Sequence, residues 1–207
     1  MTDAAAPQSN SAALYQQAID TLRRLLDEAR AAGDPEPTAM SLATVAANGR
    51  VSSRIVLLKG LGEDGLRFFS NYESAKAGQL ATHEQAAVGF HWKTLRDQVQ
   101  VRIEGQVGKL GASDSDAYFA TRPRMSQIGA WASLQSQELP NRETFDARVA
   151  EIERRFEGIE VTRPPHWGGY LLRPDLFEFW YGANFRLHDR QRYECRIGVW
   201  SQRLLYP

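Results

Sequence analysis

Four short stretches of the sequence gather cations beside hydroxyl groups or aromatic rings, although Lys+Arg and Asp+Glu both total 25. The stretch "FRLHDRQR" (185–192) holds Arg186, Arg190, Arg192 and His188, directly after the aromatic run "FEFWYGAN". Guanidinium groups bind phosphate well, and flat aromatic surfaces suit planar ligands. Because the total charge is balanced, any anion site must come from such local clusters rather than from the field of the whole protein.

Two further stretches, "SRIVLLKG" and "SNYESAKAGQL", each hold cations at positions suited to anions. Arg54 and Lys59 bracket four apolar residues. On an ideal strand they point to opposite faces, so they could serve two different anions. On this stretch alone, a buried strand with solvated cations at its ends is favoured. Lys76 follows Ser74 in the first turn of a predicted helix, where a lysine opposes the helix dipole unless an anion also binds there; a solvated lysine is the alternative.

The stretch "YFATRPRMSQIGAWASLQSQ" (118–137) has the densest set of donors. Arg122, Arg124 and Ser126 lie within five residues, and Tyr118 precedes Arg122 by one helical turn. Tyr118 and Arg122 are therefore expected on one helix face, where hydroxyl groups can complete a guanidinium–phosphate site. A surface loop with scattered arginines is the less attractive alternative, because donors and aromatic residues are so closely interleaved.

The fourth stretch combines the flat ring of Trp180 with Arg186 and His188. On a predicted strand, Arg186 and His188 share one face and Leu187 points to the other. A lone histidine is more often structural than catalytic, but a neutral histidine beside an arginine could orient an anionic aromatic ligand. Residue chemistry alone therefore indicates one or two phosphorylated, flat ligands and does not identify a reaction.

Several other classes of site and location are excluded by pattern and composition. The four histidines are scattered and Cys195 is the single cysteine, so neither a metal cluster nor an internal disulfide is expected. The sequence has no P-loop, no dinucleotide fingerprint and no G-x-S-x-G motif. The balanced charge, the lack of a long apolar run and the lack of a signal segment predict a soluble, cytoplasmic protein with no nucleic-acid or membrane partner.

The elements that must position these residues are mostly strands. A helical apolar stripe runs from Leu14 to Ala29 and ends at "AAGDPEP". Alternation and turn residues then predict many strands and three short helices: strands at 39–46, 50–60, 65–71, 86–92, 98–110, "GGYLLRP", "LFEFWYG", "FRLHDRQRYEC" and "IGVWSQRLLYP", and helices at 74–82, at 113–122 and from Asn141 onward. This pattern predicts an α+β, mainly β domain (13–207) built around a β-barrel, preceded by a flexible tail (1–12).

Six of these segments together resemble the pyridoxine/pyridoxamine 5′-phosphate oxidases. They are "SRIVLLKG", "SNYESAK", "YFATRPRMSQIGAWASLQSQ", "RPPHWGGY", "EFWYGANFRLHDR" and "QRLLYP". The resemblance runs in order from about Ala39 to Pro207, and such blocks rarely occur together elsewhere. It implies a split β-barrel of the FMN-binding type, a homodimer, and FMN held at the subunit interface.

The resemblance also implies a role for individual residues. The expected FMN contacts are Arg54, Ile55, Val56, Leu57, Phe69, Ser70, Lys76, Gln100, Gln135, Ser136, Trp180 and Arg190. The expected contacts to the phosphorylated substrate are Lys59, Tyr118, Arg122 and Ser126 around its phosphate, with Arg186 and His188 flanking its ring as the catalytic pair. No metal is implied.

The sequence departs from the family pattern in three places. Ala75 stands where the family usually has an arginine, so one contact to the FMN phosphate is expected to be lost. The segment "LRDQVQVRIEG" is two residues longer than its family counterpart, so the flavin-binding glutamine is predicted to be Gln100, with Gln98 as the alternative. Tyr181 replaces a usual glutamine. These changes could weaken FMN binding, whereas the substrate set is intact.

The reaction implied by the resemblance is oxidation of pyridoxamine or pyridoxine 5′-phosphate to pyridoxal 5′-phosphate. A hydride would pass from C4′ of the substrate to flavin N5, and O₂ would then accept the electrons and give hydrogen peroxide. Two alternatives remain open. One is a related flavin oxidase, such as a phenazine-biosynthesis type, and the other is a non-catalytic binder of flavin or pyridoxal phosphate.

Overall fold

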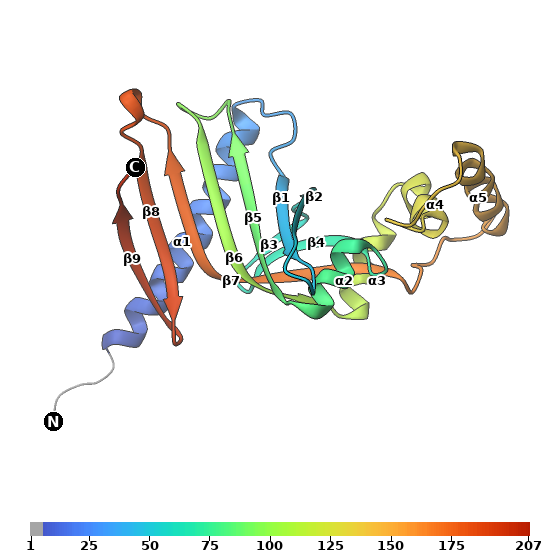
Figure 1. The fold of residues 1–207 in the computed structure, drawn as a ribbon, viewed down its shortest axis with the longest axis horizontal. Coiled ribbons are helices and arrows are strands. Elements are labelled where there is room, and N and C mark those ends of the chain that lie inside the picture. Colours follow the sequence, from blue (N-terminus) through green and yellow to red (C-terminus); the bar gives the residue numbers. More distant parts are fainter. Residues whose placement is uncertain (1–5) are drawn as a thin grey trace.

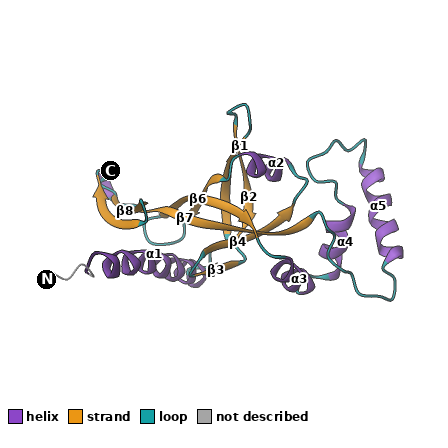
Figure 2. Ribbon diagram, turned by 90° about the horizontal axis from the view of Figure 1, so that it is seen from below, coloured by secondary structure: helices purple, strands orange, loops and turns teal. Residues whose placement is uncertain are grey.

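The computed structural model describes residues 6–207, with side chains from residue 11 onward. The N-terminal helix lies along one face of a curled antiparallel sheet, and the later α-helices lie toward the opposite end of the molecule (Figures 1 and 2). The helices are α1 Ala6–Ala31, α2 Ala75–Thr82, α3 Ala112–Ala120, α4 Arg124–Ala132 and α5 Arg142–Arg155, with the short 3-10 helix η1 Asn184–Arg186. The strands are β1 Ala39–Val45, β2 Val51–Leu57, β3 Gly60–Gly62, β4 Gly65–Asn71, β5 Gln85–Trp92, β6 Val99–Lys109, β7 Trp167–Tyr181, β8 Asp189–Arg196 and β9 Val199–Leu205. The mainly β, α+β fold class is thereby confirmed.

Strand β7 is the longest strand of the described chain and joins the two ends of the sheet. The order is β2-β1-β5-β6-β7-β4-β3, and β8 pairs with β7 and β9. Strand β6 accompanies β7 along most of its length, whereas β4 pairs only with its first half and β8 only with its second half. A register shift between Glu104 and Gly105 accommodates Pro174 of β7. A side chain at Gly105 would collide with the carbonyl oxygen of Arg173, so glycine is required there.

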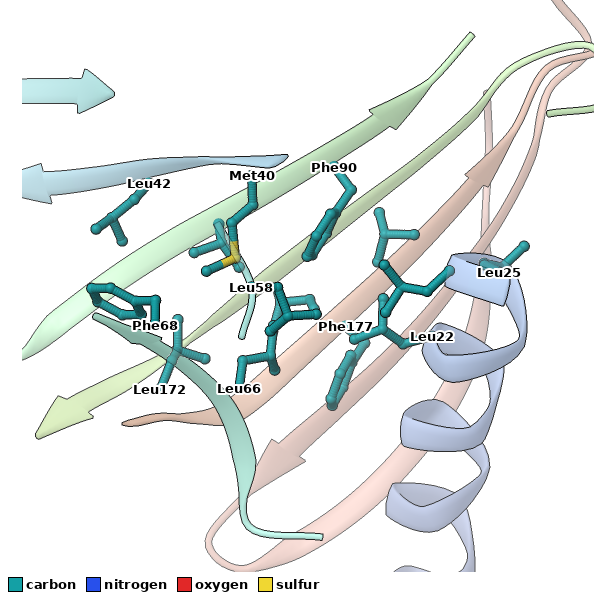
Figure 3. Close-up of a cluster of buried hydrophobic side chains, with 14 of the residues drawn as sticks. Leu22, Leu25, Met40, Leu42, Leu58, Leu66, Phe68, Phe90, Leu172 and Phe177 are labelled. Atoms are coloured by element: carbon teal, nitrogen blue, oxygen red, sulfur yellow. The ribbon is translucent and has the colours of Figure 1, made fainter. Parts of the chain in front are cut away.

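The main core lies between the concave face of the sheet and helix α1. Alternate residues of β5 and β6 point inward, as their burial pattern shows. The stripe of α1 that carries Leu22 and Leu25 packs on this face, and Figure 3 shows both leucines beside Phe90 and Phe177. Both leucines are fully buried. The barrel-like face and the long helix therefore hold each other in place through apolar burial.

A second, smaller core holds α3, α4 and α5 beside the opposite end of β7. Phe119, Ile128, Phe156 and Trp167 are buried together there. Helix α5 contacts α4 and has no fully buried residue. In both ribbon views α4 and α5 project away from the sheet, at the end opposite to β8 and β9 (Figures 1 and 2). The two ends of β7 therefore lie in two different environments.

The helices differ from the sequence-based expectations in two places. Helix α1 begins at Ala6, so residues 6–12 of the expected tail are helical, while residues 1–5 lie outside the described chain. The buried hydroxyl of Ser11 accepts a hydrogen bond from the backbone N–H of Trp200, a tertiary contact that extends the helix onto β9. Helix α4 was not predicted, because its burial against the second core, through Ile128, is a property of the folded chain.

Four predicted strands also have different bounds. The stretch 50–60 divides into β2 and β3, and the two strands predicted on either side of Pro174 are one strand, β7. The stretch predicted as a strand from Phe185 onward starts as the 3-10 turn η1, and β8 begins only at Asp189. Phe185 and Arg186 both have positive φ, of 56° and 64°, which a strand does not allow. The predicted shared strand face of Arg186 and His188 is therefore wrong.

Candidate functional site

A cavity of about 300 Å³ opens between β2, the end of β4, the start of β7, helices α2 and α3, and the segments that follow α3 and α4. It brings together residues that are far apart in sequence. Its lining is Ile55, Val56, Leu57, Lys59, Phe69, Ser70, Lys76, Tyr118, Arg122, Gln135 and Trp167. Apart from Trp167, every one of these residues was predicted to contact either the cofactor or the substrate. The structure thus places much of both predicted sets around a single space.

Lys76 lies at one side of this cavity among neutral oxygen atoms. Its Nζ donates to Ser70 Oγ at 2.9 Å, to Ser74 Oγ at 3.0 Å and to Gln135 Oε1 at 2.6 Å. Burial, and secondly the positive charge of Arg54, lower the pKa of Lys76 to about 8. Among the side chains that the structure describes, no carboxylate pairs with this ammonium group. Its charge is therefore available to an anionic ligand.

Arg54 approaches the same region from the inner face of β2, opposite Leu42 of β1. One guanidinium nitrogen donates to Thr44 Oγ1 and to the carbonyl oxygen of Leu42, and the other donates to Ser52 Oγ at 2.7 Å. Burial lowers the pKa of Arg54, but an arginine remains charged at any physiological pH. Arg54 is thus a second cation whose partners, within residues 11–207, are neutral oxygens.

The other side of the cavity is an aromatic stack with an arginine on it. The rings of Phe69 and Tyr118 stack with centroids 3.8 Å apart, and Trp167 stacks on Phe69 at 5.6 Å. The Arg122 guanidinium lies 4.5 Å from the centroid of the Trp167 ring, within the range of a cation–π contact. Burial raises the pKa of Tyr118, and the charge of Arg122 opposes that rise. Tyr118 thus remains a neutral hydroxyl donor at neutral pH.

Arg122 is also an incompletely satisfied donor. One of its terminal nitrogens is buried and has no hydrogen-bond partner among the described residues. Burial lowers the pKa of Arg122, although Tyr118 partly offsets this effect. A buried guanidinium nitrogen without a partner is costly in a folded protein.

Two predicted residues lie just outside this cavity. Ser126 lines a neighbouring cavity of about 300 Å³ that shares Arg122, Gln135 and Trp167 with the first. Ser136 lines a third hollow, between α4 and the start of α5, and has a left-handed φ of 73°. Both of these hollows share Gln135 with the first cavity, so Ser126 and Ser136 lie next to that cavity without lining it.

A second cluster forms at the far end of β7. In the register of the sheet, Gln100 of β6 lies opposite Trp180 of β7, and Trp180 lies opposite Arg190 of β8. The rings of Trp180 and His188 have centroids 4.4 Å apart. The alternative glutamine, Gln98, precedes β6, has a φ of 88° and contacts His91. The row of side chains on the outer face of the sheet therefore favours Gln100, which stays a prediction.

The turn between β7 and β8 positions His188 by a backbone hydrogen bond. The N–H of Ala183 donates to His188 Nδ1 at 3.1 Å. Because Nδ1 accepts a hydrogen bond, the ring proton of the neutral imidazole lies on Nε2, which can donate to a ligand. Arg186 lies in the same turn, next to the exposed Phe185. Both residues precede β8, so strand alternation does not set the directions of their side chains.

The arginines beside this second cluster have a carboxylate partner. Glu178 is 5% exposed and forms ion pairs with Arg102 at 2.9 Å, Arg190 at 2.6 Å and Arg192 at 2.9 Å. Burial by itself would raise the pKa of Glu178, but the hydrogen bonds from Arg192 and Arg190, with the charge of Arg102, lower it overall. This carboxylate connects three neighbouring strands.

The two clusters are far apart in a single chain. Trp167, at the first cavity, begins β7, and Trp180 lies next to its end. At a strand rise of roughly 3.3 Å per residue, these two residues are about 40 Å apart along the strand. A single flat ligand cannot span that length, so the residues of one chain that were predicted to contact FMN form two separate groups.

Sequence-based reasoning missed several residues that shape the first cavity. Trp167 supplies a stacking surface for Phe69 and for Arg122. Thr44 and Gln79 contact Arg54 from β1 and α2. Trp167 was visible only within the block "RPPHWGGY", and no local pattern distinguishes Thr44 or Gln79, because their role depends on tertiary contacts.

Two of the departures from the family pattern are also placed by the structure. Ala75 is the first residue of α2 and its side chain is exposed. Tyr181 packs against the main core and lies under the guanidinium of Arg96, 5.4 Å from the ring centroid. Tyr181 is therefore accounted for by core packing.

Among the described residues, no helix is both long and apolar enough to cross a membrane.

Comparison with known proteins assigns the chain to a family. Residues 25–156 match the family model described as pyridoxamine 5′-phosphate oxidase, and residues 167–207 match the pyridoxine 5′-phosphate oxidase C-terminal dimerisation region. The pyridoxine/pyridoxamine 5′-phosphate oxidase of Xanthomonas euvesicatoria is 54% identical over 94% of this chain and 98% of its own length. The enzyme of the same name from Xylella fastidiosa strain Temecula1 is 50% identical, over 94% of each chain.

Solved structures agree with this assignment. PhzG from Burkholderia lata, in complex with tetrahydrophenazine-1-carboxylic acid, has a TM-score of 0.86 and 34% identity over 91% of this chain and 92% of its own. A pyridoxamine 5′-phosphate oxidase-related, FMN-binding protein from Nostoc punctiforme has a TM-score of 0.72 over 91% of this chain and 96% of its own. At 18% identity, this second likeness shows the fold alone. The expected split barrel is thereby confirmed, and the chain belongs to the pyridoxine/pyridoxamine 5′-phosphate oxidase family.

Proposed function

We propose that this protein binds FMN and oxidises pyridoxamine 5′-phosphate or pyridoxine 5′-phosphate to pyridoxal 5′-phosphate, with O₂ as electron acceptor and hydrogen peroxide as product. One observation carries the proposal. The same cavity is lined by Lys59, Lys76 and Arg122 and lies next to Arg54, and none of the four forms an ion pair with a carboxylate among the described side chains. Two sets of uncompensated cations suit two phosphate groups.

The residues present fit FMN as the cofactor. Arg54 and Lys76 would hold its phosphate, because protein carboxylates do not neutralise their positive charges, and Ser70, which accepts a hydrogen bond from Lys76, would lie beside it. The apolar residues of β2, Ile55 to Leu57, offer a flat wall for a ring system. When bound, FMN would supply the two-electron acceptor that no amino-acid side chain offers.

We propose that the site is completed by a second copy of the chain. Gln100, Trp180 and Arg190 lie at the far end of β7, so their predicted contact with the cofactor requires a partner subunit. The match of residues 167–207 to a dimerisation region supports a homodimer. The sheet face that carries these residues also exposes Ile55 of β2 by 65%, an apolar side chain that an interface would cover.

The substrate's phosphate would bind Lys59, Tyr118, Arg122 and Ser126. The unpartnered nitrogen of Arg122 gives the strongest support, since a phosphate oxygen would remove its desolvation cost. Arg186 and His188 would flank the substrate ring. His188 carries its proton on Nε2 and would donate a hydrogen bond from that atom, while the N–H of Ala183 keeps the ring in this tautomer.

A phenazine-type oxidase is the second candidate, because PhzG has a TM-score of 0.86. The phosphate-suited set around Arg122 argues against it, since a substrate without a phosphate would leave the buried guanidinium nitrogen unsatisfied. Inhibition of turnover by phosphate-bearing pyridoxine analogues, and no inhibition by their dephosphorylated forms, is expected for the first candidate only.

The decisive experiment is an absorption spectrum of the purified, FMN-loaded protein before and after anaerobic addition of pyridoxamine 5′-phosphate. We expect a flavin spectrum that bleaches on addition of substrate, followed by pyridoxal 5′-phosphate and hydrogen peroxide when O₂ is admitted. A protein that takes up no FMN contradicts the proposal. A flavin that stays yellow with substrate would instead indicate a non-catalytic binder.

The assigned roles of the turn residues have their own test. Arg186→Ala or His188→Ala should lower turnover by about 100-fold with FMN still bound, because positioned donors typically contribute that much. Leu187→Ala, between them in the same turn, serves as the control. Unchanged turnover in Arg186→Ala would remove that residue from the proposed site.

A further inference from the structure

We infer that Gln79 is a positioning residue: it holds the Arg54 guanidinium through neutral hydrogen bonds and so leaves the full positive charge of Arg54 available to a phosphate. This inference rests on the proposed binding of FMN. Gln79 lies on α2, one turn after Lys76, and was not among the residues predicted from sequence. Its side-chain contacts come from two other elements, β1 and β2.

The geometry is a closed ring of hydrogen bonds. The two terminal nitrogens of Arg54 donate to two hydroxyl groups, those of Thr44 and Ser52. Both hydroxyls in turn donate to one atom, Gln79 Oε1, at 2.5 Å from Thr44 Oγ1 and 3.0 Å from Ser52 Oγ. Gln79 Oε1 also accepts directly from Arg54 at 3.3 Å. A single amide oxygen therefore receives three donors.

Proton counting shows why this oxygen matters. A hydroxyl group has one proton to donate, and the protons of Thr44 and Ser52 both go to Gln79. Their lone pairs are therefore turned toward Arg54, which can only donate. The direct contact with Arg54 also requires an acceptor, so it is the amide oxygen, and not the nitrogen, that faces the ring. Thr44 is fully buried, so water cannot take over this role easily.

The neutrality of Gln79 is the second part of the inference. A glutamate at this position would occupy the same space and accept the same hydrogen bonds, but it would form an ion pair with Arg54 and cancel its charge. With glutamine there, the charge of Arg54 still reaches Lys76, where it contributes to the low pKa of that lysine. Arg54 and Lys76 repel each other and have no carboxylate partner among the described side chains, so an anion bound beside them would be stabilised by both charges.

The test compares the affinities of the apo-protein for FMN and for riboflavin, which lacks the phosphate, by quenching of flavin fluorescence. In Gln79→Glu we expect FMN to bind about tenfold more weakly or worse, because one positive charge at the phosphate site is cancelled, with riboflavin affinity unchanged. Gln79→Met keeps the length of the side chain but removes the acceptor. It should lower FMN affinity severalfold, again with no change for riboflavin.

Gln17→Glu makes the same charge change on an exposed position of α1 and should alter neither affinity. Equal FMN affinity in wild type and Gln79→Glu would overturn the inference, as would an equal loss of FMN and riboflavin binding in a folded variant. If Gln79→Glu does not fold, Gln79→Met decides by the same criteria. A wild-type protein that binds neither flavin would instead overturn the proposed function, so the two failures are distinguishable.

Discussion

Two regions of this protein hold their cations in opposite ways. At the β8 end of the sheet, Arg102, Arg190 and Arg192 surround Glu178, which is 5% exposed. At the cavity beside α2, Arg54 and Lys76 donate only to hydroxyl, amide and carbonyl oxygens among the described residues. The first region neutralises its cations within the chain, and the second leaves them uncompensated.

The difference separates structural from ligand-binding arginines. A buried carboxylate among several arginines keeps neighbouring strands together, because removing it leaves charges without a counter-ion. Cations that are held by neutral oxygens are not neutralised by the protein. Their pKa is lowered instead, as it is for Lys76. Arg190 combines both situations, since it is a predicted FMN contact and an ion-pair partner of Glu178.

The largest expected effect is on stability, at the compensated region. Glu178→Ala should lower the free energy of unfolding by about 3 kcal/mol, since three arginines lose their shared carboxylate and are only partly exposed to water. Urea unfolding measures this. Asp146→Ala, which removes the exposed pair with Arg142, is the control and should cost less than about 0.5 kcal/mol.

The same carboxylate predicts how stability depends on pH. Because the pKa of Glu178 is lowered in the folded state, its contribution is fully present above the pKa of an unfolded glutamate and is lost as the pH falls through the folded value. The Glu178→Ala variant should therefore lose less stability on acidification than the wild type. Equal stability of the two proteins at neutral pH would contradict the role given to Glu178.

At the uncompensated region, the expected effect is on ligand affinity. Lys76→Met should weaken FMN binding by about 10- to 100-fold, the loss typical of one hydrogen bond to a charged group. Riboflavin affinity should not change, and stability should be retained, because methionine avoids burial of a charge. A parallel loss for both flavins would show that Lys76 supports the cavity rather than the phosphate.

The pH dependence of FMN affinity also tests whether Lys76 binds the phosphate through its positive charge. The pKa of Lys76 is about 8, so above that pH the free protein increasingly carries a neutral lysine and must take up a proton to bind an anion. FMN affinity should therefore fall by up to about tenfold per pH unit above pH 8. The FMN phosphate is already fully ionised there. Lys76→Met should show a flat profile over this range.

The smallest expected effect concerns the residue that departs from the family pattern. Ala75→Arg places an additional cation on the exposed first position of α2 and should tighten FMN binding about threefold. The gain is small because a cation at a helix N-terminus opposes the dipole. Ala81→Arg, at the other end of α2, is the control. Unchanged FMN affinity in Ala75→Arg would show that this contact is not missing.

Many of the elements could be predicted from the sequence because their signals are local. Strand β4 and helix α2 follow the predicted bounds closely, since alternation, turn residues and the Ser74 start are all visible over a few residues. Helix α4 could not be predicted in this way, because its stability comes from contacts with α5 and the second core. The turn at Phe185 was missed for a similar reason: no glycine marks its positive φ.

The candidate site shows the same division. The types of residue that bind phosphate, and the motif that links Tyr118 to Arg122, are legible in the sequence. Their gathering around one cavity with Trp167 is a property of the folded sheet. The separation of Gln100 and Trp180 from that cavity is also invisible in sequence, because it depends on how β7 pairs along its two halves.

The sequence by itself determined which functional groups are available: cations, hydroxyl groups and aromatic rings, in motifs that identify the family. Only the tertiary structure decided which cations are neutralised and which are left for a ligand. The physical reason is that a charge is compensated by whatever lies within a few ångströms of it. For Arg54 these groups come from β1 and α2 as well as its own strand, and for Glu178 they come from β6 and β8.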